Sequence, residues 1–289
     1  MGQQEKGQIG YGAVICVFLA SLCFSTGGLF IKLIPWGALA INGTRNLIGA
    51  ALIGIYLLIT RHRIVLSRQV FLGALSLMGV TTLFTLANKL TTAANAIVLQ
   101  FTAPVFVILL MALIFKARPT RLDLITCAAV FLGVILFFID GLRAGNLLGN
   151  FIAILSGVCY AGVFMMNTGK NADAISSCFI GQLLSGVIFT PFIAGETDFS
   201  FPVVLAVLGL GLVQVGGAYI LFSYGIKRTP PVTASLITGL EPILNPLWVA
   251  LFYHERVTVL AVIGAVIVVG SIIAYNVIMA KKGKQEAGP

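Results

Sequence analysis

The stretch VTASLITGLEPILNPLWVALF, residues 232–252, places one carboxylate, Glu241, inside a long apolar run. A run of this length predicts a transmembrane helix. Even by the lower estimates, a charged acid at the centre of a bilayer costs about 2.5 to 3.5 kcal/mol. A chain that keeps such a residue usually uses it, so Glu241 is the first candidate for a functional residue.

The composition extends this interpretation to the whole chain. Of its 289 residues, 59% are hydrophobic and 9% are charged, whereas soluble domains carry about 25% charged residues. The apolar runs are continuous rather than alternating with polar residues, which favours helices over an outer-membrane barrel. Short polar breaks separate ten runs of membrane-spanning length, at residues 10–34, 37–60, 69–88, 91–115, 122–139, 146–168, 174–194, 202–225, 230–253 and 257–279.

The basic residues predict the orientation of these helices. The net charge is +9, but Lys and Arg on a membrane protein usually mark its cytoplasmic loops rather than a nucleic-acid surface. With a cytoplasmic N-terminus, thirteen of them fall on the cytoplasmic side, against five on or near the other side: Lys32, Arg45, Lys89, Arg143 and Arg256. We therefore expect both termini in the cytoplasm and an even number of spans. The first run lacks a convincing cleavage site and is expected to be a retained helix.

A shift of 138 residues reveals an internal repeat, because it aligns Pro104 with Pro242 inside corresponding runs. Five helices per repeat is an odd number, so the second half would enter the bilayer in the opposite sense. We expect an all-α membrane protein of ten transmembrane helices in two inverted five-helix repeats, 1–139 and 140–280, followed by a disordered basic tail at 281–289. Inverted repeats can expose a central site to alternate sides. An immobile duplicated scaffold is the alternative, although Ala103 stands where the second half has Glu241.

The chain resembles the ten-helix, EamA-type branch of the drug/metabolite transporter superfamily. The resemblance rests on residues 239–243 (GLEPI), residues 253–257 (YHERV), Gly264 and Gly270. The first half departs from the pattern, since it has no loop acid where Glu255 stands in the second. The resemblance implies a transporter of the cytoplasmic membrane for a small organic solute, such as an amino acid, an amine or a choline-like compound. It indicates neither the solute nor the direction of transport.

The residues around Glu241 predict a site for a cation. Thr238, Glu241, Asn245 and Trp248 share one helical face. The carboxylate would neutralise a cation, which an indole ring also attracts by about 0.5 to 2 kcal/mol. Burial disfavours the charged form of an acid, so Glu241 could also exchange a proton for substrate. Four further candidates come from other runs: Gln100, which aligns with Thr238, and the aromatic residues Phe24, Tyr160 and Tyr219.

A zwitterionic amino acid would need a further donor for its carboxylate. Lys and Arg are expected only near helix ends, and Arg45 in particular is expected to reach towards lipid headgroups. This absence favours a cationic solute, moved by secondary active transport and with Glu241 as the coupling residue if protons drive it. The alternative is an amino-acid or drug exporter in which Glu241 is structural and hydrogen-bonded across the break at Pro242.

Other classes of protein fit the chain less well. An intramembrane enzyme would need paired acids, or a nucleophile with a base, and the runs hold one deep acid and no deep histidine. A non-transporting receptor or assembly subunit would need larger loops to bind a partner. The sequence predicts no cofactor, no metal site and no nucleic-acid partner. The expected partners are the solute, the lipid bilayer and protons, for a monomer or a homodimer.

Overall fold

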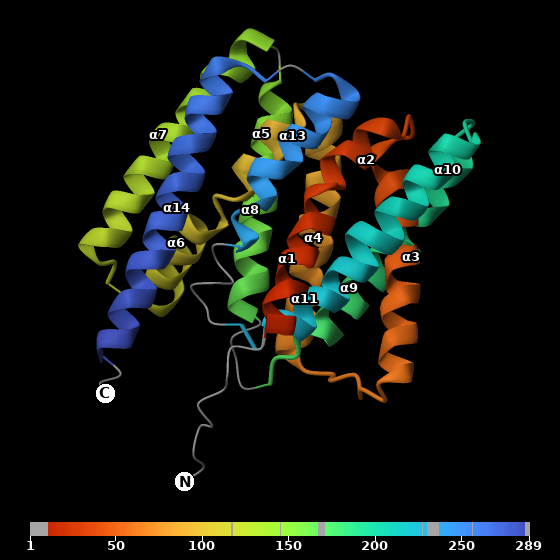
Figure 1. Ribbon diagram of the computed structural model, residues 1–289, viewed down its shortest axis with the longest axis horizontal. Coiled ribbons are helices and arrows are strands. Elements are labelled where there is room, and N and C mark those ends of the chain that lie inside the picture. Colours follow the sequence, from red (N-terminus) through yellow and green to blue (C-terminus); the bar gives the residue numbers. More distant parts are fainter. Residues whose placement is uncertain are drawn as a thin grey trace.

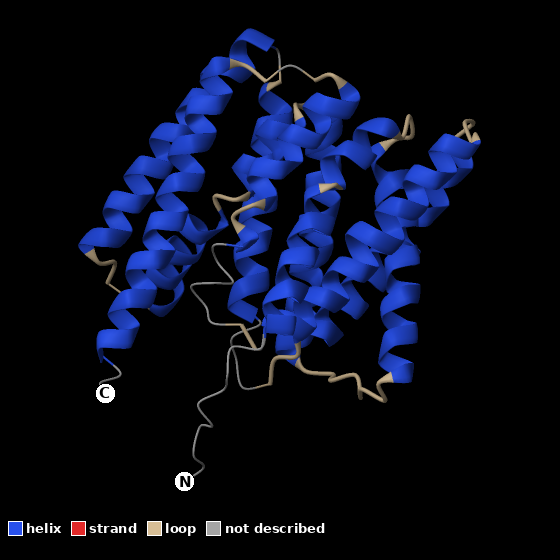
Figure 2. Ribbon diagram, in the orientation of Figure 1, coloured by secondary structure: helices blue, strands red, loops and turns tan. Residues whose placement is uncertain are grey.

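The protein is described by a computed structural model, which places residues 11–116, 118–144, 146–166, 171–226, 228–229, 237–255 and 257–286. Every regular element in these ranges is helical, as Figure 2 shows. Eight stretches of helix are long and apolar enough to cross a membrane: Gly12–Leu33, Ala38–Ile59, Arg68–Leu90, Ala93–Leu113, Leu147–Met166, Ala174–Gly195, Phe201–Gly225 and Val259–Met279. The chain therefore has the all-helical, multi-pass architecture that its composition predicts.

The remaining two of the ten predicted runs are also helical where they are described. The run at 122–139 lies within α7, Arg121–Ala144. The run at 230–253 contains α13, Glu241–Tyr253, whereas residues 230–236 lie outside the described part. The other elements are α1 (Tyr11–Ser25), α2 (Gly27–Leu33), α3 (Ala38–Ile59), α4 (Arg68–Leu90), α5 (Ala93–Gln100), α6 (Ala103–Phe115), α8 (Leu147–Met166), α9 (Ala174–Phe189), η1 (Thr190–Gly195), α10 (Phe201–Leu208), η2 (Gly209–Gly217), α11 (Ala218–Ile226) and α14 (Val259–Glu286).

Several runs fold as two helices with a break between them. The first run is interrupted at Thr26, between α1 and α2, and the fourth at residues 101–102, between α5 and α6. The eighth passes through the π-helical segment η2, which ends at Gly217. At the other end of the chain, α14 continues to Glu286, beyond the tail boundary predicted at residue 280. Lysines at 281, 282 and 284 favour this continuation, because cations stabilise a helix C-terminus.

The helices form a bundle with one attached pair (Figure 1). In the bundle, α4 packs against α8 and α9, α3 packs against α9 and η2, and α1 packs against α11. The attached pair is α7 with α14, which pack along each other, and the hydroxyl of Tyr275 donates to Asp123 Oδ1 at 2.7 Å across them. The start of α1 and the end of α14 lie at the same, lower end of the bundle in Figure 1. That this end is cytoplasmic stays a prediction.

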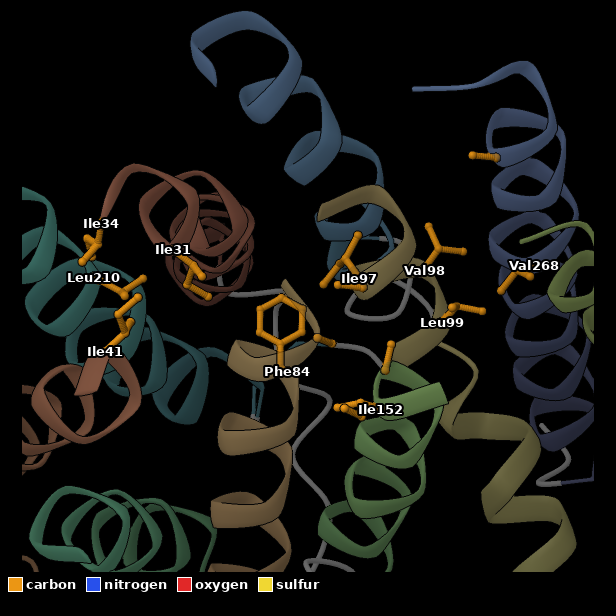
Figure 3. Packing of buried hydrophobic residues seen from close by; sticks show 14 of the residues in the cluster. Ile31, Ile34, Ile41, Phe84, Ile97, Val98, Leu99, Ile152, Leu210 and Val268 are labelled. Carbon is orange, nitrogen blue, oxygen red and sulfur yellow. The ribbon is translucent and has the colours of Figure 1, made fainter. Parts of the chain in front are cut away.

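The larger of the two clusters of buried apolar side chains in the described part of the chain includes residues of α2, α3, α4, α5 and α8 (Figure 3). Ile31 of α2, Phe84 of α4, Ile97 of α5 and Ile152 of α8 all belong to it. Ile31 and Ile97 are fully buried. This cluster holds the short helices α2 and α5 against the longer ones, which closes the bundle where those short helices lie.

Candidate functional site

Glu241 lies at the first position of a helix. A turn at Gly239–Leu240 precedes α13, which begins at Glu241. Pro242 follows in the first turn of the helix, where its missing amide costs no hydrogen bond. A carboxylate at a helix N-terminus interacts favourably with the helix dipole. The break expected at Pro242 is thus the start of a new helix, whose first residue is Glu241.

The first half of the chain repeats this construction. The helix α6 begins at Ala103, carries Pro104 next, and spans 13 residues, as α13 does. The residues that end the two helices, Lys116 and His254, both adopt the left-handed conformation, with φ of 53° and 56°. All three features agree with the shift of 138 residues. The repeat is therefore visible in these two helices, while the inverted arrangement of the halves stays a prediction.

A cavity of about 470 Å³ lies in the middle of the bundle, beside Glu241. Its volume falls in the range that small-molecule sites occupy. Six of the eight predicted site residues line it: Phe24, Gln100, Tyr160, Tyr219, Thr238 and Glu241. Glu241 is partly accessible to this space and forms no hydrogen bond or ion pair with a described residue. Its carboxylate is available to a ligand.

The expectation that Arg45 reaches towards lipid headgroups is wrong. Arg45, seven residues after the start of α3, is 2% exposed and lines the same cavity as Glu241. It cannot reach headgroups, because its guanidinium group turns inward to the Thr81 carbonyl oxygen at 3.0 Å and to Gln214 Oε1 at 3.4 Å. Its Nε has no hydrogen-bond partner. No ion pair links Arg45 to Glu241, so the cavity is lined by a basic and an acidic side chain that do not pair with each other.

A polar network between α3, α4 and α9 holds Arg45 in place. Asn42 Oδ1 accepts from Arg45 Nη2 at 3.4 Å and from Asn46 Nδ2 at 2.9 Å, and Asn46 Nδ2 also donates to Ser185 Oγ at 2.8 Å. These residues were missed because Asn and Arg near a predicted helix end suggest capping or contact with headgroups. The available signal was their spacing: residues 42, 45 and 46 lie on one face of α3.

Aromatic rings form much of the remaining wall. The rings of Phe24 and Tyr219 meet edge to face with centroids 5.0 Å apart, and Phe24 meets Phe222 in the same way at 6.1 Å. Tyr160 and Phe164 stack in a tilted arrangement at 4.7 Å. Gln100 is held at the wall by its Nε2, which donates to Ser156 Oγ at 2.7 Å. These contacts keep the rings and the amide in fixed positions around the two charges.

Asn245 and Trp248 lie away from this cavity, although both share a helical face with Glu241. Trp248 Nε1 donates to Ser25 Oγ of α1 at 2.9 Å. Asn245 is fully buried and packs against Gly28 of α2, and neither of its amide atoms has a hydrogen-bond partner. Because α13 starts at Glu241, the residues one and two turns later leave the cavity and contact α1 and α2 instead.

A second, more apolar cavity of about 550 Å³ adjoins the first. Tyr160, Phe164, Phe222 and Thr238 line both cavities. The second cavity extends between α6 and α14 and is bounded there by apolar side chains such as Val107 and Ile272. The charged site therefore opens onto an apolar space that could accept an uncharged part of a ligand.

One end of the charged cavity reaches the segment before α9, where Ala172, Asp173 and Ala174 line it. Asp173 Oδ2 pairs with His62 Nε2 at 2.9 Å and accepts from Ser176 Oγ. Burial raises the pKa of Asp173, but the hydrogen bonds from Ser176 and His62 lower it by more. The pKa of Asp173 therefore lies below its ordinary value. Within the described ranges, His, Cys, Asp and Glu form no group that could hold a metal ion.

Comparison with known proteins agrees with this architecture. The model of the EamA-like transporter family matches residues 12–139 and 147–277. One solved crystal structure superimposes with a TM-score of 0.64 over 93% of this chain and 98% of the other, at 18% sequence identity, which supports the fold.

Curated relatives include transporters with and without an assigned solute. The threonine/homoserine exporter RhtA of Salmonella typhimurium strain LT2 is 26% identical over 190 residues, which are 64% of this chain and 62% of that protein. The same exporter of Escherichia coli K12 is 27% identical over 66% of each chain. An uncharacterized transporter of Archaeoglobus fulgidus is 30% identical over 66% of this chain and 70% of its own length. The match to the Salmonella exporter thus spans less than two thirds of its length.

Proposed function

Because the chain belongs to the EamA-like transporter family, whose members are membrane transporters and not enzymes, we propose that it exports a small zwitterionic solute of the amino-acid type. It is a multi-pass protein of the cytoplasmic membrane that acts on a small molecule. The exporters of threonine and homoserine among its relatives support this class of solute and this direction.

The observation that carries the proposal is the pair of separated charges in one cavity. Arg45 and Glu241 both line it, and no ion pair joins them. A guanidinium group binds a carboxylate through two parallel hydrogen bonds. A carboxylate in turn binds an ammonium group. A buried charge without a partner is costly, and a zwitterion would supply both missing partners at once.

The walls of the cavity suggest where the rest of the solute lies. The rings of Phe24, Tyr160 and Tyr219 surround the space beside Glu241 and can contact an ammonium group by cation–π attraction. The neighbouring apolar cavity, reached past Phe164 and Phe222, can accept the solute's side chain. This position predicts better binding for amino acids with apolar side chains than for glycine.

Glu241 also provides a route for proton coupling. When the solute leaves on the outside, the carboxylate of Glu241 loses its ammonium partner and can bind another cation. A proton is the smallest cation that can neutralise this carboxylate. An empty carrier with a protonated Glu241 could return through the bilayer without an unpaired anion, which lowers the cost of that step. One proton would then enter for each solute exported, by alternating access.

A second candidate solute is a cation without a carboxylate, such as an amine or a choline-like compound. The aromatic rings next to Glu241 favour it. Arg45 opposes it, because the guanidinium would remain without an anionic partner when a cation binds. The two candidates therefore differ in what they require of Arg45.

The test is a set of matched ligands added to the purified protein. An amino acid is compared with the amine that lacks its carboxylate and with the hydroxy acid that lacks its ammonium group. A ligand that binds only the folded state raises the melting temperature. We expect the amino acid to raise it and the two analogues to have little effect. Stabilisation by the amine alone would support the cation, and stabilisation by none would contradict both proposals.

Transport is tested in liposomes that contain only this protein. Glu241→Gln should abolish proton-driven export while the protein stays folded. Asp198→Asn is the control, because Asp198 lies in a loop and its carboxylate accepts a hydrogen bond from the backbone amide of Ser200, two residues along the chain. Unchanged coupling in Glu241→Gln would overturn the role of this acid. Absence of saturable transport by the wild-type protein alone would favour a receptor or an assembly subunit.

A further inference from the structure

We infer that Lys32 and Glu255 form a gate that closes the cavity at the end opposite to Asp173. Lys32 lies in the last turn of α2, and Glu255 follows the C-terminal end of α13. The inference rests on the proposed function, since only a transporter needs such a gate. It adds the residues that hold the gate shut and the helix that connects them to the site.

The contacts of Lys32 join three segments. Its Nζ lies 3.2 Å from Glu255 Oε1 and donates to the Thr91 carbonyl oxygen, at the end of α4, at 2.8 Å. The two charged side chains are only 13% and 16% accessible. Nearby, Lys89 Nζ donates to the Ile34 carbonyl oxygen, just after α2. Two lysines therefore tie the ends of α2 and α4 together, and one of them also holds α13.

Glu255 makes a second contact with its other oxygen. Its Oε2 accepts from the backbone amide of Ala93, the first residue of α5, at 3.0 Å. That amide has no partner within the helix, and a carboxylate at this point also interacts favourably with the helix dipole. The single carboxylate of Glu255 thus fastens α13 to α5 and to α2 simultaneously.

Below this pair, α2 and α13 are packed very closely. A Cβ atom on Gly28 would lie 2.2 Å from Asn245 Oδ1 and 3.1 Å from Ala93 Cβ, so a larger residue there would require the Asn245 side chain to move. Asn245 is fully buried with both amide atoms unpartnered. An unpaired buried amide opposes the closed contact. Opening would let water reach Asn245, so the ion pair and the apolar packing must hold the gate against this cost.

The helix α13 connects this gate to the site. Glu241 is its first residue and Glu255 lies two residues beyond its end, about 20 Å away at 1.5 Å per residue. A tilt of α13, driven by a solute at Glu241, would move Glu255 away from Lys32. At the opposite end, the cavity is lined by Asp173 and its neighbours. The structure thus has one closed end and one end where the cavity meets the segment before α9, which the predicted topology places in the cytoplasm.

The experiment measures access to the gate from outside. Asn245→Cys is introduced as a probe, and intact cells are treated with a thiol reagent that cannot cross the membrane. Labelling at residue 245 is quantified by mass spectrometry, which distinguishes this position from the five native cysteines. The probe is combined with Glu255→Gln, with Lys32→Met, or with Asp198→Asn as the control acid in a loop.

We expect slow labelling in the probe variant and in the control. Glu255→Gln and Lys32→Met should each raise the rate about tenfold, the population change that corresponds to about 1.4 kcal/mol. Two different variants are used because a folding defect in one would not affect the other in the same way. The folding of both variants is checked by size-exclusion chromatography, in which each should elute as a single peak. Their combination should add little, since each removes the same ion pair.

An unchanged labelling rate in both variants, in a protein that still transports its solute, would overturn the gate and leave the proposed function intact. Labelling only in inside-out vesicles would also overturn it, because this end of the bundle would then be cytoplasmic. The opposite combination, faster labelling in a protein without transport, would support a moving closure and contradict the proposed function.

Discussion

At the scale of single residues, Arg45 is a costly side chain, because it is a buried cation without an ion-pair partner in the described part of the chain. It is 2% exposed, two of its three hydrogen bonds are 3.4 Å long, and its Nε has no partner. Such an arrangement is poor as a structural ion site, because no carboxylate among the described residues pairs with it. It is well suited to an anionic group that arrives and leaves, since weak contacts can be exchanged for strong ones.

We predict that Arg45→Gln lowers the affinity for a carboxylate-bearing ligand by about thirtyfold, because removal of one partner from a buried charge pair costs about 2 kcal/mol or more. Arg45→Lys keeps the charge but loses the planar fork, so its loss should be smaller, about tenfold. Affinities are measured by ligand-induced thermal stabilisation. The amine analogue serves as the internal control. Equal losses for amino acid and amine would mean that Arg45 acts on the fold and not on the carboxylate.

The sequence could predict one of the two charges but not the other. Glu241 is recognisable because a charged residue in the middle of an apolar run is costly and is usually kept for a function. Arg45 is seven residues into its helix, where a long side chain could equally reach the membrane surface or turn inward. Which of these occurs depends on Thr81 and Gln214, from α4 and η2. Contacts between distant segments are not visible in the spacing of one helix.

At the scale of elements, the prolines predicted a disturbance but not its form. Pro104 and Pro242 each sit at the second position of a new helix, so they start α6 and α13 instead of bending longer ones. The missing amide of proline fits both situations. The consequence for the site is large: with α13 starting at Glu241, Asn245 and Trp248 fall at the contact with α1 and α2.

We predict that Asn245→Leu stabilises the protein. The amide of Asn245 is buried without a partner, and an apolar side chain of similar size avoids a penalty of about 1 to 3 kcal/mol. A rise in melting temperature of a few degrees should follow. Asn46→Leu is the matched control and should lower it, because Asn46 Nδ2 donates to Asn42, Thr81 and Ser185. A lower melting temperature for Asn245→Leu would indicate that the amide has a partner in solution.

The pair between Asp173 and His62 predicts a pH effect on the loop between α3 and α4. The pKa of Asp173 is lowered from 3.8 by its hydrogen bonds. A group with a depressed pKa contributes stability that is present above its unfolded value and is lost as the pH falls through the folded value. The wild-type protein should therefore melt higher than Asp173→Asn at pH 6, and the difference should shrink below about pH 4. A difference that persists in acid would assign the effect to packing.

At the scale of the whole molecule, eight of the ten predicted runs form helices of membrane-spanning length. These were predictable because the length of a run is set by the thickness of the bilayer. The breaks within runs were not, since α1 continues into α2 and α5 into α6 with only one or two residues between them. The proposed gate could also not be predicted from the hydrophobic periodicity of the sequence. Glu255 was noticed in a motif, but its contacts with Lys32 and Ala93 arise between segments far apart in the chain.

The proposed gate and the internal repeat together predict an asymmetry between the two faces of the membrane. A shift of 138 residues takes Lys32 to Lys170, while Ala117 stands where the second half has Glu255. Residues 117 and 170 lie outside the described part, so this step rests on the sequence repeat alone. If the halves are inverted, the outer gate has an ion pair and its cytoplasmic counterpart lacks the acid. The resting carrier would then face the cytoplasm, which suits an exporter that loads its solute there.

We predict that Ala117→Glu supplies the missing acid, pairs with Lys170 and shifts the carrier towards the outward-facing state. External labelling at residue 245 should rise, and export at low internal solute should fall, because fewer carriers wait on the cytoplasmic side. Ala117→Gln, similar in size but uncharged, is the matched control and should change neither. The shift should disappear when Lys170→Met is added. An Ala117→Glu protein that folds, transports and labels like the wild type would mean that the two halves do not form equivalent gates, and the inverted repeat would lose its main mechanical consequence.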